Sequence, residues 1–288
     1  MLKIPRALHG IAWMIASGIA FALLNTLLRL IALQMPPLEV QFLRYFSGLI
    51  VMSPFIFQVG IRAYNPKGLM GQCWRGVVHT AGMVLWYMAL PHLTLADTTA
   101  IGFTGPIFVM VGAAWAFGER MYWERWVSAA IGFTGVLIVV GPKMTVAGGY
   151  YDLIMLGSAP LFAASALITK ALTKRDKTEV IVVWQCITIS VFTLPLAIPQ
   201  WEWPTLVQWS IFLGSGVLGS VAHYCATSAL RAADASATQS VKFLDMVWMT
   251  TMGFLVFSDV PTISTIAGGL VIAGATTWIA RRESKRAP

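Results

Sequence analysis

Two opposite charges stand three residues apart in an otherwise apolar stretch: Lys242 and Asp245, within SVKFLDMVWM at residues 240–249. Residues at i and i+3 are neighbours on a helix, so this spacing predicts an ion pair. If the stretch lies in a lipid bilayer, a charge near the centre costs about 2.5–3.5 kcal/mol on insertion scales and should face protein or a water-filled cavity. Two interpretations remain: the charges contact a ligand, or they only neutralise each other and hold helices together.

Polar and aromatic side chains also recur at helical spacing in two other apolar segments. His79, Met83 and Tyr87 stand at every fourth position and share one helical face. At an offset of 140 residues from Met83 and Tyr87, the chain has His223 and Thr227. We expect both faces to line one cavity, where Tyr87 and His223 hydrogen-bond to a ligand or stack on it. The alternative is that the histidines are packing residues and that His79 lies at a membrane interface.

Four further polar residues lie within apolar segments. Asn25 shares a helical face with Phe21 and Arg29, and we include it among the candidate ligand contacts. Arg44 lies deeper in its segment and is a second possible contact. Arg29 and Lys170 lie within about a turn of segment ends, where long side chains reach the interface, so we expect both to be anchors.

Gly102, Gly105 and Pro106 interrupt another apolar segment. Glycine permits close approach of helices, and proline removes a backbone hydrogen bond and bends a helix. We expect these three residues to act as a hinge or gate beside the cavity. For the glycines, simple tight packing is an equally good explanation.

The composition places these side chains in a membrane protein. Hydrophobic residues make up 57% of the 288 residues and charged residues 11%, with a mean hydropathy of +0.73. Soluble proteins usually carry about 25% charged residues. The basic excess of +8 is spread between apolar segments, so we expect no nucleic-acid partner. The three cysteines show no metal-ligand spacing, and we expect neither a metal nor a cofactor.

Apolar runs separated by helix breakers predict ten membrane-spanning helices in a single all-α domain covering residues 1–288. Of the 20 Lys and Arg residues, 15 (Arg75 among them) fall at loops on one side, and only Lys143 falls on the other. Positive loops stay in the cytoplasm, so both termini should be cytoplasmic. The predicted spans are residues 10–33, 38–59, 74–90, 94–117, 124–141, 151–172, 180–198, 206–230, 234–257 and 261–280.

The chain resembles itself at an offset of about 140 residues. ALPHLTLADTTA at 89–100 resembles ALRAADASATQS at 229–240, and Phe103 pairs with Phe243. We therefore expect a five-helix unit that occurs twice, at residues 10–142 and 151–281. Because five is odd, the second unit must enter the membrane from the opposite side. Such inverted-topology repeats are typical of alternating-access transporters, whose site lies near the midplane between the repeats.

Several motifs also resemble a known family. FLRYFSGLIVMSPF in the second span, Gly105-Pro106, Gly118-Glu119 and GFTGVLIVVG in the fifth resemble EamA-type ten-helix permeases of the drug/metabolite transporter superfamily. Within that superfamily the chain looks most similar to bacterial amino acid exporters, including the aromatic amino acid branch. The resemblance implies a multi-pass permease of the bacterial inner membrane, with a central cavity lined mainly by spans one, three, four, six, eight and nine.

The leading hypothesis is therefore a secondary transporter, not an enzyme, that exports small organic metabolites, amino acids first, through the lipid bilayer. No GxxxxGK[ST] phosphate loop is present, so we expect no use of ATP. The ammonium group of Lys242 should favour the ionised form of the Asp245 carboxylate, which would then be a poor proton carrier near neutral pH. We therefore expect facilitated diffusion or exchange rather than obligatory proton antiport. The alternatives are a proton-coupled exporter of cationic drugs and an intramembrane enzyme. The enzyme alternative lacks support from paired carboxylates or a nucleophile with its base.

Overall fold

The computed structural model describes residues 6–31, 34–93, 101–141, 149–258 and 260–286, and this part of the chain is helical without a β-strand. Short 3₁₀ turns lie at Ile61–Tyr64, Leu90–His92 and Ile198–Gln200. The α-helices are α1 (Arg6–Arg29), α2 (Pro37–Val59), α3 (Leu69–Ala89), α5 (Gly105–Phe117), α6 (Trp123–Val140), α7 (Tyr150–Leu172), α8 (Thr178–Ala197), α9 (Leu206–Ala232), α10 (Ala235–Gln239), α11 (Leu244–Phe257) and α12 (Ile263–Arg286).

Many of these helices have the length and composition of membrane spans. In the described part of the chain, seven stretches qualify: α1, α2, α7, α8, α9, α12 and the stretch that joins α10 to α11. The shorter helix α5 is also apolar. This confirms an all-α architecture with several membrane-capable helices. Residues 94–100 of the fourth predicted span and Lys143 lie outside the described residues, so the count of ten spans stays a prediction.

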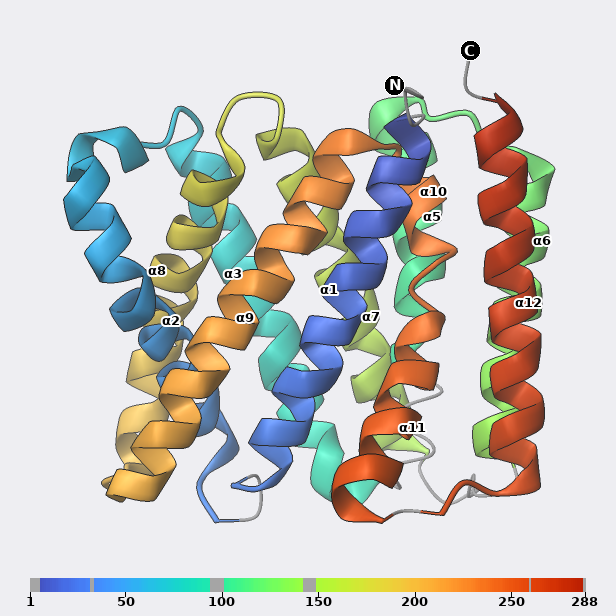
Figure 1. Cartoon of the computed structure of the whole chain (residues 1–288). Coiled ribbons are helices and arrows are strands. Elements are labelled where there is room, and N and C mark those ends of the chain that lie inside the picture. Colours follow the sequence, from blue (N-terminus) through green and yellow to red (C-terminus); the bar gives the residue numbers. More distant parts are fainter. Residues whose placement is uncertain (1–5, 32–33, 94–100, 142–148, 259, 287–288) are drawn as a thin grey trace.

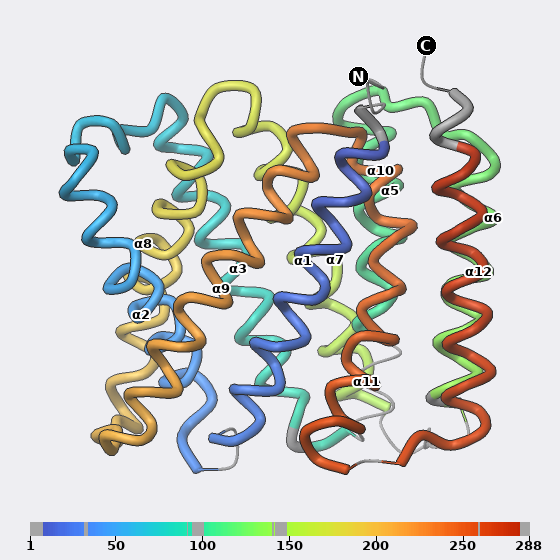
Figure 2. The backbone as a smooth tube through the Cα atoms, viewed as in Figure 1, coloured from blue at the N-terminus to red at the C-terminus, as the bar shows by residue number. Residues whose placement is uncertain are grey.

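The helices form one bundle in which they run roughly side by side (Figure 1). Helices α2 and α8 pack together at one edge, and α6 and α12 pack together at the opposite edge. Between these edges, α1 packs along α9 and α3 packs along α7. The backbone trace shows that α1 begins and α12 ends at the same end of the bundle (Figure 2).

Glycines allow the closest helix crossings. A Cβ atom added at Gly216 of α9 would lie 2.6 Å from the carbonyl carbon of Ser47 on α2. At the other edge, a Cβ atom at Gly135 of α6 would lie 2.9 Å from the carbonyl oxygen of Gly268 on α12. The hydrophobic effect does not drive helices together in lipid. Close van der Waals packing at small residues is therefore a principal force that associates helices in membranes.

The stretch from α10 to α11 is a broken helix (Figure 1). Residues 240–243 form successive turns, in which the Lys242 amide donates to Gln239 O at 3.1 Å and the Asp245 amide donates to Lys242 O at 2.9 Å. The backbone donors are thus satisfied by tighter i to i−3 bonds. The prediction of one continuous helix over 234–257 was wrong: Lys242 lies in the break and Asp245 lies in the first turn of α11.

A second break precedes α5. Phe103 and Thr104 form a turn after helical residues 101–102, and α5 begins at Gly105 with Pro106 in its first turn. The predicted interruption of this segment at Gly102, Gly105 and Pro106 is therefore present. Gly102 lies just before the turn, and a Cβ atom at Gly105 would meet no atom within 4 Å.

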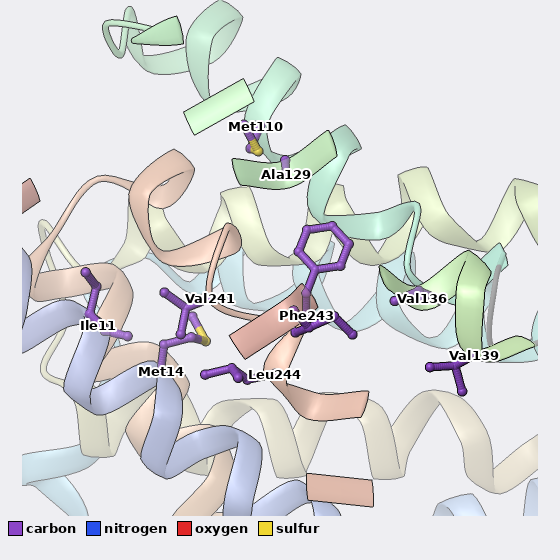
Figure 3. Packing of buried hydrophobic residues seen from close by; sticks show 11 residues of the cluster. Ile11, Met14, Met110, Ala129, Val136, Val139, Val241, Phe243 and Leu244 are labelled. Carbon is purple, nitrogen blue, oxygen red and sulfur yellow. The ribbon is translucent and has the colours of Figure 1, made fainter. Parts of the chain in front are cut away.

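Phe243 holds the α10–α11 break in place. Its side chain is fully buried in a cluster that includes Met110 of α5 and Val136 of α6 (Figure 3). The Phe243 ring stacks on the ring of Phe103, with centroids 5.9 Å apart and an interplanar angle of 18°. The two breaks therefore contact each other through their aromatic residues, and Lys242 directly precedes one of these residues in the chain.

Candidate functional site

Two cavities lie next to each other in the bundle. The central cavity has a volume of about 380 Å³, and the second cavity has a volume of about 550 Å³. Both volumes fall in the range of about 300–1,000 Å³ that is usual for small-molecule pockets. The two cavities share four lining residues: Trp86, Gly102, Pro106 and Lys242.

The two cavities extend towards opposite ends of the bundle. Met14 of α1 and Thr169 near the end of α7 line the central cavity, on the side where α1 begins. Arg29 and Leu90, at the far ends of α1 and α3, line the second cavity. Trp86 and Gly102 are close neighbours at the junction, where a Cβ atom at Gly102 would lie 3.3 Å from the Trp86 ring.

Every predicted ligand-binding or hinge residue lines one of these cavities, although their roles remain predictions. The structure separates Tyr87 from His223: Tyr87 lines the second cavity, and His223 lines the central one. The two helical faces therefore do share the central cavity through His79, Met83, His223 and Thr227, and only Tyr87 lies on the far side of the junction. The central cavity contains His79, Met83, Gly105, His223 and Thr227; the second contains Asn25, Tyr87 and Asp245; Gly102, Pro106 and Lys242 line both.

The predicted ion pair is present but loose. The Lys242 Nζ atom lies 3.9 Å from Asp245 Oδ2, and the two side chains are 37% and 20% exposed. A distance of 3.9 Å is too long for a hydrogen bond. Gly18 of α1 gives the carboxylate its space, since a Cβ atom there would overlap Asp245 Oδ1. Both charged groups thus keep unused hydrogen-bonding capacity beside the junction.

Tyr45 joins the two histidines of the central cavity. Its hydroxyl lies 3.1 Å from His79 Nε2 and 3.2 Å from His223 Nε2. A hydroxyl has one proton and two lone pairs, so it donates to at most one of the two rings and accepts from the other. At least one imidazole therefore donates at Nε2 when both hydrogen bonds are made. Tyr45 was not among our candidate residues, because its contacts with α3 and α9 are tertiary.

Arg75 sets the direction of this network. Its guanidinium donates to Gln185 Oε1 at 2.7 Å, which leaves the Gln185 amide nitrogen to donate to His223 Nδ1 at 3.3 Å. The Gln185 amide nitrogen also lies 3.4 Å from His223 Nε2; when it donates to Nδ1 instead, His223 Nε2 can donate to Tyr45 and Tyr45 can donate to His79. In this arrangement each ring accepts at one nitrogen, so both histidines are neutral. The hydrogen bonds connect α2, α3, α8 and α9 around the cavity.

Two arginines face this network. Arg75 is only 4% exposed and lines the central cavity, whereas we had counted it among loop residues. That assignment was wrong because α3 begins at Leu69, more than a turn before Arg75. Arg44 also lines the cavity, and its guanidinium lies 4.9 Å from the centroid of the Tyr45 ring.

The two expected interface anchors differ in their surroundings. Lys170 Nζ donates to Leu230 O at 2.6 Å and also to Ala233 O. It thus satisfies carbonyl groups at the C-terminal end of α9, and the anchor interpretation was wrong for this residue. Arg29 lies over the Phe257 ring, 4.1 Å from its centroid, at the rim of the second cavity.

No group of three or more His, Cys, Asp or Glu side chains with metal-binding geometry occurs among the described residues. The two cavities are lined by aromatic faces, neutral hydrogen-bonding groups and a few charged side chains. The described residues offer hydrogen bonds and ring faces to a bound molecule from several helices at once.

The sequence aligns over almost its whole length with named bacterial transporters. It is 31% identical over 284 residues to the riboflavin transporter of Rhizobium johnstonii, covering 98% of this chain and 94% of that protein. It is 25% identical over 278 residues to the S-adenosylmethionine uptake transporter of Rickettsia prowazekii, covering 96% and 94%. A solved protein structure superposes with a TM-score of 0.80 at 16% identity, covering 96% of this chain and 99% of the other, which shows a shared fold.

The model of the EamA-like transporter family matches the chain twice, at residues 8–141 and 149–281. Together the two matches cover nearly the entire sequence, and they agree with the membrane-capable helices. The chain is thus a multi-pass membrane protein and belongs to the EamA-like transporter family.

Proposed function

We propose that this protein is a secondary transporter that moves a small metabolite with a planar aromatic ring system across the bacterial inner membrane, with riboflavin as the first candidate cargo. The observation that carries the proposal is the lining of the central cavity, where aromatic rings from several helices surround hydrogen-bonding groups. Phe162 lies edge-on to His79 at 5.3 Å and to Trp86 at 6.4 Å between centroids, and Phe21 lies edge-on to His223 at 5.0 Å.

An isoalloxazine-like ring fits such a lining for two physical reasons. Aromatic rings attract one another in stacked and edge-to-face arrangements, which contribute about 0.5–1.5 kcal/mol per pair beyond burial. Neutral donors and acceptors such as Gln185 and Ser165 can pair with the polar edge of the ring without a charge penalty. The similarity to a riboflavin transporter over nearly the full chain supports the same cargo.

The transport mechanism that we propose is alternating access between two inverted five-helix repeats. Its support comes from the double match to one family model, at residues 8–141 and 149–281, and from the two broken helices whose Phe103 and Phe243 rings stack. Broken helices at the interface of inverted repeats are where transporters of this general design bind their cargo. In this mechanism the central cavity opens to the cytoplasm, where both termini lie, and the second cavity opens to the other side.

Amino acid transport is the second candidate, and the Lys242–Asp245 pair favours it. The 3.9 Å separation leaves the ammonium free to bind a carboxylate and the carboxylate free to bind an ammonium. A zwitterion could therefore bridge the pair. A cationic-drug exporter fits less well, because Arg44 and Arg75 line the central cavity and Asp245 lines only the second one.

Counterflow in proteoliposomes tests the proposal. Vesicles with purified protein are preloaded with unlabelled riboflavin, phenylalanine, S-adenosylmethionine or a lipophilic cation, and each labelled compound is added outside at trace concentration. We expect labelled riboflavin to accumulate in vesicles preloaded with riboflavin, with no need for a pH gradient. His223→Ala should abolish this accumulation, whereas Thr277→Ala, on the exposed side of α12, should not. Accumulation of phenylalanine without riboflavin would instead establish the second candidate, and accumulation of neither would refute both.

A further inference from the structure

We infer that the central cavity contains a subsite for an anionic group of the cargo, a carboxylate or a phosphate, formed by Arg44 and Arg75. The inference rests on the proposed function, because it names a charged feature of the molecule that the cavity transports. It would distinguish an acidic aromatic metabolite from a neutral one of the same shape.

The first observation is that the buried charge of Arg75 has only neutral partners. Its guanidinium donates to Ile181 O at 3.1 Å and to Gln185 Oε1 at 2.7 Å, while its Nε atom is buried without a hydrogen-bond partner among the described residues. Arginine remains protonated in proteins, so the positive charge persists at this site. Hydrogen bonds to a carbonyl and an amide orient this charge but do not neutralise it.

The second observation is that Arg44 is also uncompensated. Its Nε atom is buried without a hydrogen-bond partner, and no carboxylate of the described residues lies within ion-pair distance. The contact with the face of Tyr45 positions the guanidinium but leaves its donors available. Gly219 borders this guanidinium, since a Cβ atom at that position would lie 3.8 Å from Arg44 Nε.

Two arginines without acids in one membrane cavity are energetically costly. An uncompensated charge near the bilayer centre is rare and usually faces a partner or a water-filled pathway. Arg125, by contrast, lies 3.1 Å from Asp234, so this chain does pair a buried arginine with an acid elsewhere. In the central cavity the missing negative charge must come from outside the described chain. A bound anion supplies it and accepts two parallel hydrogen bonds from a guanidinium.

The neighbouring residues define what the anion is attached to. Tyr45 contacts Arg44 on one side and the two histidines on the other, and the rings of Phe21 and Phe162 lie beyond those histidines. An anion at the arginines would therefore belong to a molecule whose aromatic part lies against His79, His223 and these phenylalanines. An aromatic ring system with an acidic side arm matches this order of groups.

Matched ligand pairs test the subsite directly. Binding to the purified full-length protein in nanodiscs is measured by calorimetry for riboflavin against riboflavin 5′-phosphate, and for N-acetyltryptophan amide against N-acetyltryptophan. Within each pair only the anionic group differs. The flavin pair therefore measures the preference for a phosphate, and the tryptophan pair measures the preference for a carboxylate. We expect at least one acidic member to bind about tenfold more tightly than its neutral partner, because charge-assisted bonds are roughly twice as strong as neutral ones.

Variants assign that preference to residues. Arg44→Gln should bring the acidic and neutral affinities together while changing the neutral affinity by less than about threefold, as expected for loss of a charge-assisted contact alone. Arg44→Lys, which keeps the charge and serves if Arg44→Gln does not fold, should retain only part of the preference because an ammonium cannot form the bidentate contact. Arg62→Gln removes an exposed arginine and should keep the full preference.

The outcomes separate this inference from the proposed function. Equal affinities within both pairs for the wild type, or a preference that persists in Arg44→Gln, would overturn the subsite even if riboflavin is transported. A preference for N-acetyltryptophan, without binding of either flavin, would support the subsite and refute the flavin cargo. The absence of binding by all four compounds would contradict both proposals.

Discussion

The central cavity and the second cavity share four lining residues, but their charged side chains have different partners. In the central cavity, neutral groups hydrogen-bond to one another through Tyr45 and Gln185, while two arginines lack acidic partners. In the second cavity, the acid Asp245 lies beside the base Lys242. A cavity with organised neutral groups and two arginines without acidic partners among the described residues can select a molecule. In the second cavity Arg29 lies over the Phe257 ring and Lys242 lies beside an acid, so these charges hold a passing molecule less tightly. We therefore regard the central cavity as the binding site and the second as its exit or entrance.

The largest effect should come from closing the junction between the cavities. Gly102→Leu would place a side chain where a Cβ atom already lies 3.3 Å from the Trp86 ring. We expect transport in proteoliposomes to fall to the level of empty liposomes while calorimetric binding at the central cavity persists. Gly274→Ala, on α12 and outside both cavities, is the matched control, because its added methyl group meets nothing within 4 Å and transport should continue. Loss of binding together with transport would show that the two cavities are not separate sites.

Next in size is the loss of the hydroxyl that joins the two histidines. Tyr45→Phe leaves one imidazole nitrogen without its donor and another without its acceptor, and an unsatisfied buried group costs about 1–3 kcal/mol. We expect weaker cargo binding and a lower free energy of unfolding in detergent. Tyr87→Phe, in the second cavity, removes a hydroxyl with no hydrogen bond to a described residue and should change binding little. If Tyr45→Phe and Tyr87→Phe weakened cargo binding equally, the central cavity would not differ from the second cavity as a binding site.

A smaller effect is expected where α1 approaches the ion pair. In Gly18→Ala the new methyl group overlaps Asp245 Oδ1, and the carboxylate must move. Because a side-chain end can shift, we expect a cost of about 1 kcal/mol, at the low end for overpacking. The transport rate should fall several-fold with binding at the central cavity unchanged. Gly269→Ala, whose added methyl group would be 4.0 Å from the nearest atom, should transport normally.

The smallest effect concerns the ion pair itself. A double-mutant cycle with Lys242→Met and Asp245→Asn, measured by unfolding in detergent, should give a coupling free energy of about 0.5 kcal/mol. The 3.9 Å separation and partial exposure weaken the mutual attraction. A coupling free energy of several kcal/mol would mean that the ion pair stabilises the fold. The second cavity would then be as highly organised as the central one.

Composition and periodicity predicted the all-helical membrane architecture and a part of the cavity lining. Long apolar runs predict membrane-spanning helices, because a segment in lipid must satisfy its own backbone hydrogen bonds. The period of these helices then indicates which residues share a face. His79, Met83, His223 and Thr227 line the central cavity as a consequence of simple helical spacing. That inference needed only the period of the helix and one internal offset.

Tertiary contacts account for what the sequence did not predict. Residues 240–243 contain neither Gly nor Pro, so the break beside Lys242 has no local signal; it depends on Phe243 packing against α5 and α6. Arg75 and Lys170 were misassigned because their acceptors, on α8 and α9, are more than 50 residues distant in sequence. Only the approach of separate helices reveals that such basic residues are bound inside the protein.

The hydroxyl of Tyr45 between two imidazoles also makes the site a spectroscopic reporter. In the arrangement in which Gln185 donates to His223 Nδ1, one ring donates at Nε2 and the other accepts there, so His79 and His223 are different tautomers in the same protein. Their ring nitrogens should therefore give distinct resonances in a sample labelled with ¹⁵N-histidine. A cargo that separates α2 from α3 or α9 would change one pattern or both, and the two neutral rings would record the occupancy of the cavity without any attached probe.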